Sequence, residues 1–259
     1  MTVLIHPTAV IHPGARLAAD VKVGAYSIIG EHVSIDAGCE IGPHVVIEGV
    51  TTIGRDNRIF QFASVGSAPQ DKKYAGEPTR LEIGDRNTIR ECCTINTGTV
   101  QDGGLTRLGN DNWIMAYVHI AHDCMIGNNT ILANNATLAG HVHLGDWVFL
   151  GGFTTIHHVG RVGAHARPAL TAAVPQDVPP DVTAAGNRAK PAGLNSEGLR
   201  RRGFSPEAIM AIKRAYKTLY RQGLTLDEAR AQLQEQGQHY PEVQLFVDFI
   251  AAAERGIIR

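Results

Sequence analysis

The sequence predicts an all-β fold, a parallel β-helix built from a six-residue repeat, followed by a C-terminal α-helical domain. Aliphatic residues recur at every sixth position over most of the first 174 residues, and a glycine often follows them. Neither the 3.6-residue period of an α-helix nor the alternation of an ordinary strand produces a strict period of six. A solenoid of stacked repeats does produce it. We place the β-helix at residues 1–180 and the helical domain at residues 181–259.

The repeat converts sequence spacing into a map of the molecule. Each hexad is expected to form a short strand and a turn, so three hexads close a triangular coil of 18 residues. Parallel pairing stacks the coils about 4.8 Å apart, which places residues n and n+18 one above the other. Glycines after the aliphatic positions, such as Gly24 and Gly42, are expected to supply the corner angles. The in-phase aliphatic positions are Ile5, Ile11, Leu17, Val23, Ile29, Ile35, Ile41, Ile47, Ile53, Ile59, Val65, Ile83, Ile89, Ile95, Leu108, Ile114, Ile120, Ile126, Leu132, Leu138, Leu144, Leu150, Ile156, Val162 and Val174.

Two interruptions of the repeat are expected to project as loops. The phase breaks across residues 66–82 and again across residues 97–107. Loops that project from a rigid scaffold commonly carry function. We therefore expect binding residues in these two segments.

The C-terminal part of the chain shows helix signals. Ser205 and Pro206 suit the N-cap and first position of a helix. Thr225 and Glu228 form a capping-box pattern, and Pro241 is placed to open a last helix. The tail is therefore expected to be an all-α cap after a linker.

The composition argues against several classes of function. With 24 basic and 25 acidic side chains, no overall field draws the chain to nucleic acid or to an anionic membrane. There is no apolar run of about 18 residues and no leader pattern, so we expect no membrane insertion and a cytoplasmic location. The four cysteines form no C-x-x-C pair, which suits a reduced protein.

The 18-residue map gathers histidines on one part of the prism. His122 lies under Gly140, which lies under His158, while His141 and His157 stand one residue to either side of that column. Histidines on a solvated prism face are the plain alternative for any one of them. Several on one patch favour a functional site.

The segment from His119 to Asp123 offers an imidazole beside a carboxylate. Such a neighbour can fix the tautomer of His122 and raise its basicity, which suits a general base. A zinc site is the rival reading, because γ-class carbonic anhydrases bind zinc through three histidines on this kind of helix. The gap of three residues between His119 and His122 does not match that class, and we expect no metal.

Several motifs carry a closer resemblance. The chain resembles the UDP-N-acetylglucosamine O-acyltransferase family, hexapeptide-repeat transferases that open lipid A biosynthesis. The resemblance covers nearly the whole length and implies a left-handed β-helix. Its motifs are Gly54-Arg55-Asp56-Asn57, Gln61-Phe62-Ala63-Ser64, Lys73-Tyr74-Ala75-Gly76-Glu77-Pro78-Thr79-Arg80, His119-Ile120-Ala121-His122-Asp123-Cys124, the run from Ile131 to His141, Gln176-Asp177-Val178-Pro179-Pro180 and the run from Gly198 to Phe204.

The resemblance implies a reaction and partners. An (R)-3-hydroxyacyl group passes from the phosphopantetheine of acyl carrier protein to the 3-hydroxyl of UDP-N-acetylglucosamine, without another cofactor, in a homotrimer that shares its active sites between subunits. His122 would be the general base, Asp123 would orient it, and the amide N-H of Gly140 would stabilise the oxyanion. By the same resemblance, the sugar and phosphates would be held by Asp71, Lys73, His119 and His141, and the nucleotide by Asn195, Glu197, Arg201 and Arg202; His157 is a further expected substrate-binding residue.

Two positions depart from the family pattern. Asn96 stands where His is found in well-known members, so it keeps hydrogen bonding but cannot titrate near the sugar phosphates. Leu170 stands where the long-chain enzymes carry Gly, and is expected to act as a ruler that favours acyl chains shorter than fourteen carbons. N-acylation of a 3-amino sugar nucleotide stays open as an alternative, and a purely structural β-helix would leave the two loops and the basic tail unexplained.

Overall fold

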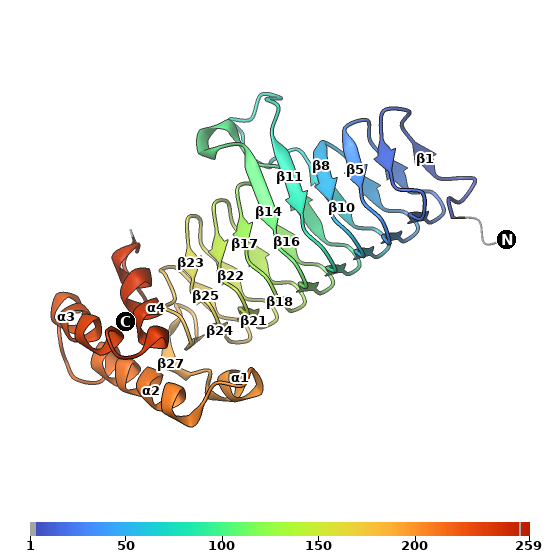
Figure 1. Cartoon of the computed structure of the whole chain (residues 1–259). Coiled ribbons are helices and arrows are strands. Elements are labelled where there is room, and N and C mark those ends of the chain that lie inside the picture. Colours follow the sequence, from blue (N-terminus) through green and yellow to red (C-terminus); the bar gives the residue numbers. More distant parts are fainter. Residues whose placement is uncertain (1–3, 254) are drawn as a thin grey trace.

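The chain forms a triangular prism of stacked coils with helices at its C-terminal end (Figure 1). The computed structural model describes residues 4–253 and 255–259. Three parallel sheets of nine, eight and seven strands make the faces of the prism, and a sheet of three strands follows at its end. The predicted parallel β-helix with a helical C-terminal part is confirmed.

The strands of each face are short. The nine-stranded sheet consists of β1 (Val10–Ile11), β4 (Ile28–Ile29), β7 (Val46–Ile47), β10 (Ser64–Ser67), β13 (Thr94–Asn96), β16 (His119–Ile120), β19 (Thr137–Leu138), β22 (Thr155–Ile156) and β25 (Ala173–Val174). The eight-stranded sheet consists of β2 (Arg16–Leu17), β5 (Val33–Ile35), β8 (Val50–Ile53), β11 (Arg80–Ile83), β14 (Leu105–Leu108), β17 (Met125–Ile126), β20 (His143–Leu144) and β23 (Arg161–Val162). The seven-stranded sheet consists of β3 (Lys22–Val23), β6 (Glu40–Ile41), β9 (Arg58–Ile59), β12 (Thr88–Ile89), β15 (Trp113–Ile114), β18 (Ile131–Leu132) and β21 (Phe149–Leu150).

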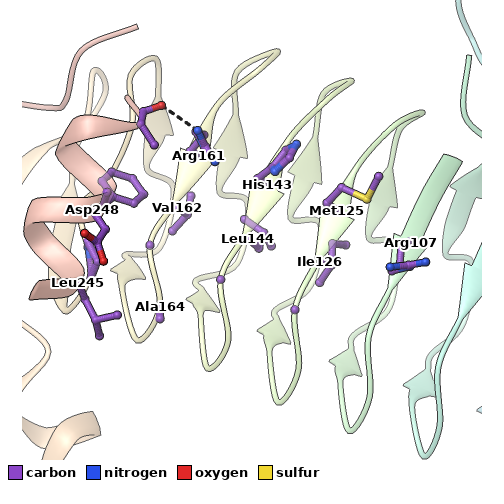
Figure 2. A pocket seen from close by; sticks show the side chains of 16 residues that line it. Arg107, Met125, Ile126, His143, Leu144, Arg161, Val162, Ala164, Leu245 and Asp248 are labelled. Carbon is purple, nitrogen blue, oxygen red and sulfur yellow. Dashed lines mark hydrogen bonds between the residues drawn. The ribbon is translucent and has the colours of Figure 1, made fainter. Parts of the chain in front are cut away.

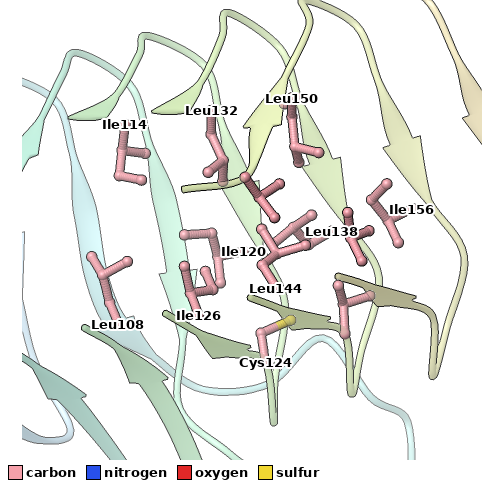
Figure 3. Close-up of a cluster of buried hydrophobic side chains, with 14 of the residues drawn as sticks. Leu108, Ile114, Ile120, Cys124, Ile126, Leu132, Leu138, Leu144, Leu150 and Ile156 are labelled. Carbon is pink, nitrogen blue, oxygen red and sulfur yellow. The ribbon is translucent and has the colours of Figure 1, made fainter. Parts of the chain in front are cut away.

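The strand register confirms a coil of 18 residues. His119 pairs with Thr137, and Thr137 pairs with Thr155. The step lengthens only where a loop is inserted, as between Ser64 and Thr94. In-phase aliphatic side chains such as Ile120 and Leu138 point into the prism and are fully buried (Figure 3). Each such side chain stabilises the stack by about 1.5–3 kcal/mol, which fixes the register on which the site depends.

Three edges join the faces, and we name them by the order in which the chain meets them. The first edge links the nine-stranded to the eight-stranded sheet, the second links the eight-stranded to the seven-stranded sheet, and the third returns to the nine-stranded sheet. Both loops rise from the first edge (Figure 1). They span residues 68–79 and 97–104, which is shorter than expected, because Arg80 already pairs with Val50 and Leu105.

The glycines after the aliphatic positions act differently from the prediction. The left-handed backbone angles fall on the third residue after the aliphatic position, as at Asp123 (φ 59°) and His141 (φ 62°), and not on these glycines. A Cβ on Gly24 would lie 2.6 Å from the backbone nitrogen of Pro43 in the next coil. The expectation that these glycines provide the corner angles is wrong; they allow close stacking of the coils.

The C-terminal part contains more regular structure than predicted. The three-stranded sheet joins β24 (Arg167–Pro168), β26 (Val182–Ala185) and β27 (Lys190–Leu194). Four helices follow: α1 (Ser196–Arg201), α2 (Pro206–Tyr220), α3 (Leu226–Gly237) and α4 (Pro241–Ala251). The N-cap Ser205 and the capping box of Thr225 and Glu228 are confirmed. The hairpin β26–β27 and the helix α1 replace the expected linker, and the domain boundary at residue 180 stays a prediction. Within the described residues, no helix has both the length and the apolar character needed to cross a bilayer.

Candidate active site

A histidine and a buried aspartate form a hydrogen-bonded pair on the first edge. Nδ1 of His122 lies 2.8 Å from Oδ2 of Asp123. An ionised carboxylate can only accept a hydrogen bond, so the proton of the neutral imidazole is on Nδ1. Nε2 of His122 then carries the free lone pair, and the ring is still 12% exposed while the carboxylate is fully buried. This is the arrangement of a general base with an orienting acid.

The carboxylate of Asp123 is held by the second loop. The backbone N-H of Thr99 donates to Oδ1 at 2.8 Å, and the Thr99 hydroxyl donates to Oδ2 at 2.6 Å. The backbone N-H of Asp123 donates to the hydroxyl of Thr106 at 2.8 Å. Hydrogen bonds that favour the charged form offset the cost of burying this carboxylate.

Gly140 lies directly above the His122 ring, as the 18-residue map predicts. A Cβ placed on Gly140 would be 2.5 Å from Cε1 and 2.6 Å from Nε2 of His122. Only a glycine therefore leaves room for the imidazole in this position. Within the described residues the amide N-H of Gly140 has no acceptor, so it is free to donate to a bound group.

His141 and His158 complete a cluster around His122. The ring centroids of His122 and His141 are 5.0 Å apart, and those of His141 and His158 are 4.8 Å apart. Nδ1 of His141 lies 2.6 Å from Oδ2 of Asp102 in the second loop. Burial lowers the pKa of His158, and the charges of His141 and His122 lower it further.

His119 and His157 lie at the margins of this cluster. Nδ1 of His119 bonds to the hydroxyl of Thr94 at 2.7 Å. Burial lowers the pKa of His119, and the charge of His122 lowers it further. His157 is exposed, and its Nδ1 lies 3.1 Å from the carbonyl oxygen of His158.

Three of these groups are close enough to contact a single metal ion. His122, Asp123 and His141 each offer one atom that could bind a metal, and these three atoms lie within 4.8 Å of one another. The carboxylate of Asp123 is, however, already engaged by Thr99 and by the His122 proton. These hydrogen bonds favour an acid-base pair over a set of metal ligands.

The first loop does not bring its two predicted residues to the histidines. Oδ1 of Asp71 accepts a hydrogen bond from the backbone N-H of Lys73 at 3.0 Å, within the loop itself. In the part of the chain that the structure describes, no hydrogen bond or ion pair joins either residue to His122 or His141. Asn96 is buried and its amide donates to the carbonyl oxygens of Ser67 (3.3 Å) and Ala68 (3.1 Å). In this chain Asn96 therefore anchors the base of the first loop.

The four residues predicted to bind the nucleotide lie beside the second edge. Asn195 caps α1 and donates to the carbonyl oxygen of His165, which lies on that edge. Glu197 pairs with Arg201 at 3.1 Å on the exposed side of α1. Arg202 donates to the carbonyl oxygen of Trp147 at 3.1 Å, with its guanidinium 5.3 Å from the centroid of the indole. One chain thus carries the histidines and the nucleotide residues on different edges.

A buried acid lies behind Arg202. Asp181 is 1% exposed, and neither carboxyl oxygen has a hydrogen-bond partner within the described residues. Burial raises the pKa of Asp181 to about 7, although the charge of Arg202 opposes this. Burial also lowers the pKa of Arg202. The ionised form of Asp181 is therefore costly to the fold.

We expect Asp181→Asn to stabilise the protein at pH 8 more than at pH 5. The pKa of about 7 in the folded chain lies above the usual value near 3.9 of an unfolded Asp, so the wild type loses stability as pH rises between these values. The advantage of the variant should grow by about 2–3 kcal/mol between pH 5 and pH 8. Urea denaturation at both pH values measures it, with the exposed Asp227→Asn as control. A gain that is equal at both pH values would contradict the assignment.

A groove lies on the face of the eight-stranded sheet, beside α4 (Figure 2). It has a volume of about 540 Å³ between the eight-stranded sheet and α4, and its lining includes Met125, His143, Arg161 and Leu245. Arg161 closes one end by donating to the carbonyl oxygen of Ala252 at 2.8 Å. The groove does not include His122, and a smaller cavity of about 260 Å³ beside the histidine cluster is lined by residues that include Asp102 and His141.

Sequence reasoning missed Asp102, Thr99 and Trp147. Asp102 and Thr99 belong to the second loop, where the repeat is interrupted and the 18-residue map gives no position. Trp147 could have been found, because His165 follows it by one coil and both lie beside the predicted Arg202.

Comparisons with known proteins agree with this architecture. The family described as "Udp N-acetylglucosamine O-acyltransferase; Domain 2" matches residues 177–258, and "Bacterial transferase hexapeptide (six repeats)" matches residues 106–140. A relative from Janthinobacterium sp. (strain Marseille), named acyl-(acyl-carrier-protein) UDP-N-acetylglucosamine O-acyltransferase, is 68% identical over 99% of both chains. A relative of the same name from Herminiimonas arsenicoxydans is also 68% identical over 99% of both.

Solved structures show the same fold. The UDP-N-acetylglucosamine O-acyltransferase (LpxA) from Moraxella catarrhalis superimposes with a TM-score of 0.97 at 46% identity, and the match covers 99% of this chain and 100% of that one. The fold is thus a left-handed parallel β-helix of hexapeptide repeats. The extent and identity of these matches, together with the stacked histidine site, show that the chain is an acyltransferase and belongs to the family of UDP-N-acetylglucosamine O-acyltransferases.

Proposed function

We propose that the chain transfers an (R)-3-hydroxyacyl group from acyl carrier protein to the 3-hydroxyl of UDP-N-acetylglucosamine, the first step of lipid A biosynthesis. The observation that carries the mechanism is the His122 imidazole, fixed by the buried Asp123 and lying beneath Gly140. The names of the relatives support the substrates. The carrier-bound donor supplies the acyl group, and the expectation that no further cofactor is needed stays a prediction.

The chemistry follows from the proton positions. Nε2 of His122 takes the proton of the sugar hydroxyl as its oxygen attacks the thioester carbonyl carbon. The amide N-H of Gly140 donates to the oxyanion that forms, a contact worth roughly 3 kcal/mol in comparable sites. Collapse breaks the carbon-sulfur bond, and the phosphopantetheine thiolate takes the proton back from Nε2. Asp123 holds the ring throughout and remains ionised.

A homotrimer with shared sites accounts for the separation of the predicted residues. The histidines lie on the first edge and Arg201 and Arg202 beside the second, so a neighbouring subunit would have to supply the nucleotide-binding half. Exposed aromatic side chains on the third edge offer a surface for association, because exposed apolar patches commonly mark interfaces. They are Tyr26, Phe62, Tyr117 and Phe153, each 59–60% exposed. The cytoplasmic location stays a prediction.

An acyl-transfer assay tests the reaction. The purified protein is supplied with UDP-N-acetylglucosamine or its 3-amino analogue, and with 3-hydroxyacyl carrier proteins of graded length. We expect an ester at the 3-oxygen of UDP-N-acetylglucosamine. Faster acylation of the amine would replace the proposal with N-acyl transfer, and no turnover of either sugar would overturn it.

Leu170 is proposed to set the acyl chain length. Its side chain is 67% exposed on the third edge. A Cβ on Gly152, one coil below, would be 3.3 Å from Cδ1 of Leu170, so the leucine covers that coil. Each methylene in a packed groove changes discrimination by about 1–3 kcal/mol.

We therefore expect the wild type to prefer chains of ten to twelve carbons and Leu170→Gly to shift the preference toward fourteen. Competition between a ten-carbon and a fourteen-carbon 3-hydroxyacyl carrier protein measures the ratio of their kcat/KM values. This ratio should differ at least tenfold between the wild type and Leu170→Gly. Leu245→Ala, at an exposed leucine of α4, should leave the ratio unchanged. The same ratio in wild type and Leu170→Gly would refute the ruler.

A further inference from the structure

We infer that Asp102 is a positioning residue for His141, whose carboxylate fixes the proton and orientation of that imidazole beside the catalytic pair. The two residues are 39 positions apart, yet Oδ2 of Asp102 lies 2.6 Å from Nδ1 of His141. Asp102 is the last residue of the short 3-10 helix η1 (Val100–Asp102), which forms part of the second loop. The inference rests on the proposed function and on the prediction that His141 binds the sugar and phosphates of the substrate.

The contact determines which nitrogen of His141 faces the site. A carboxylate accepts but does not donate, so Nδ1 of His141 carries the proton. Nε2 is then directed to the catalytic pair, 3.7 Å from Oδ2 of Asp123. The His141 ring meets the His122 ring edge to face, with an interplanar angle of 89°. Rotation of the His141 ring would lose both the approach of Nε2 to Asp123 and the edge-to-face contact with His122.

The second loop and the first edge hold each other through two carboxylates. The edge supplies Asp123, which accepts from the N-H and the hydroxyl of Thr99 in the loop. The loop supplies Asp102, which accepts from His141 on the edge. Gly98 of the second loop packs against the carboxylate of Asp123, since a Cβ on Gly98 would lie 2.7 Å from Oδ1 of Asp123. Asp102 thus differs from Asp71 of the first loop: Asp102 accepts a hydrogen bond from a histidine of the prism, whereas Asp71 accepts one from the backbone of its own loop.

Because the Asp102–His141 contact is partly exposed, a role of Asp102 in activity can be distinguished from a role in folding. The side chain of Asp102 is 56% exposed and that of His141 is 17% exposed. Even exposed pairs with full charge on both partners contribute little to folding, so a partly exposed hydrogen bond to a neutral imidazole should not contribute more. Removing the carboxylate of Asp102 should therefore leave the denaturation midpoint nearly unchanged while it frees the His141 ring.

Steady-state kinetics test the inference. Removal of a carboxylate that orients a metal-ligating histidine typically changes affinity or activity by about 10–100-fold, and we expect an effect of the same order for His141. We expect Asp102→Ala to raise KM for UDP-N-acetylglucosamine at least tenfold, with KM for the acyl carrier protein unchanged and kcat changed less than threefold. Asp102→Glu should restore part of the loss. Gln101→Ala, the exposed neighbour in η1, should behave as wild type.

Two further measurements distinguish positioning from a general effect. In a His141→Ala background, Asp102→Ala should add no further loss. The ¹⁵N shifts of His141 should report a protonated Nδ1 in the wild type and a mixture of tautomers in Asp102→Ala. An equal loss in the His141→Ala background, or unchanged tautomers, would overturn the inference. If the wild type fails to acylate UDP-N-acetylglucosamine, the proposed function falls, and the ¹⁵N shifts still decide the role of Asp102.

Discussion

Gly140→Ala is expected to lower kcat by about 100-fold without unfolding the protein. The added Cβ would lie 2.5 Å from Cε1 of His122, closer than real carbon contacts allow, so the imidazole must leave its place. A displacement of about 1 Å in a catalytic group can cost on the order of 100-fold. The backbone N-H of residue 140 is retained in this variant, so the loss reports the position of the His122 ring. Single-turnover acyl transfer measures it.

The matched control is Gly30→Ala, on the same edge of an N-terminal coil. A Cβ there would be 3.2 Å from Cα of Glu48, which requires only a small adjustment. We expect transfer within about twofold of the wild type for this control, because its coil carries none of the proposed site. Normal turnover by Gly140→Ala would show that catalysis does not depend on the position of the His122 ring beneath residue 140.

His122→Ala is expected to lower kcat by about 100-fold to 10,000-fold, the usual contribution of a general base. The variant removes the nitrogen that accepts the proton of the sugar hydroxyl, while the free N-H of Gly140 and the substrate-binding groups remain. KM for both substrates should therefore change much less than kcat. Initial rates over a range of each substrate separate the two constants.

His32→Ala serves as the control for this variant. His32 lies on the first edge in an N-terminal coil, and its side chain is 65% exposed. Its removal should leave kcat and KM unchanged. Near-normal turnover by His122→Ala would remove the general base from the mechanism.

The fold was predictable because one physical constraint acts on every coil. The in-phase aliphatic side chains are buried from Val23 onward, while Ile5 at the N-terminal end of the prism is 43% exposed, and this pattern determines period, stacking and core together. The same constraint predicted that His122 would lie under Gly140. The role of the glycines was mistaken, because a period of six locates the corners but not the residue that adopts the left-handed angles there.

The rest of the site depends on contacts that no period determines. Asp102 reaches His141 from a loop of irregular backbone, and Asn96 bonds to the start of the other loop. Arg202 meets Trp147 only because α1 folds back on the second edge. Each of these contacts joins a segment outside the repeat to the prism, so neither hexad spacing nor helix propensity could predict them.

The central claim is that stacking of 18-residue coils places residue 140 on the His122 ring, and a double-mutant cycle tests it most directly. Single-turnover rates are measured for the wild type, Gly140→Ala, His122→Ala and the double variant. If the alanine at position 140 acts by displacing the imidazole, it has nothing left to displace in His122→Ala, and the double variant should match that single variant. Losses that multiply in the double variant would contradict the claim.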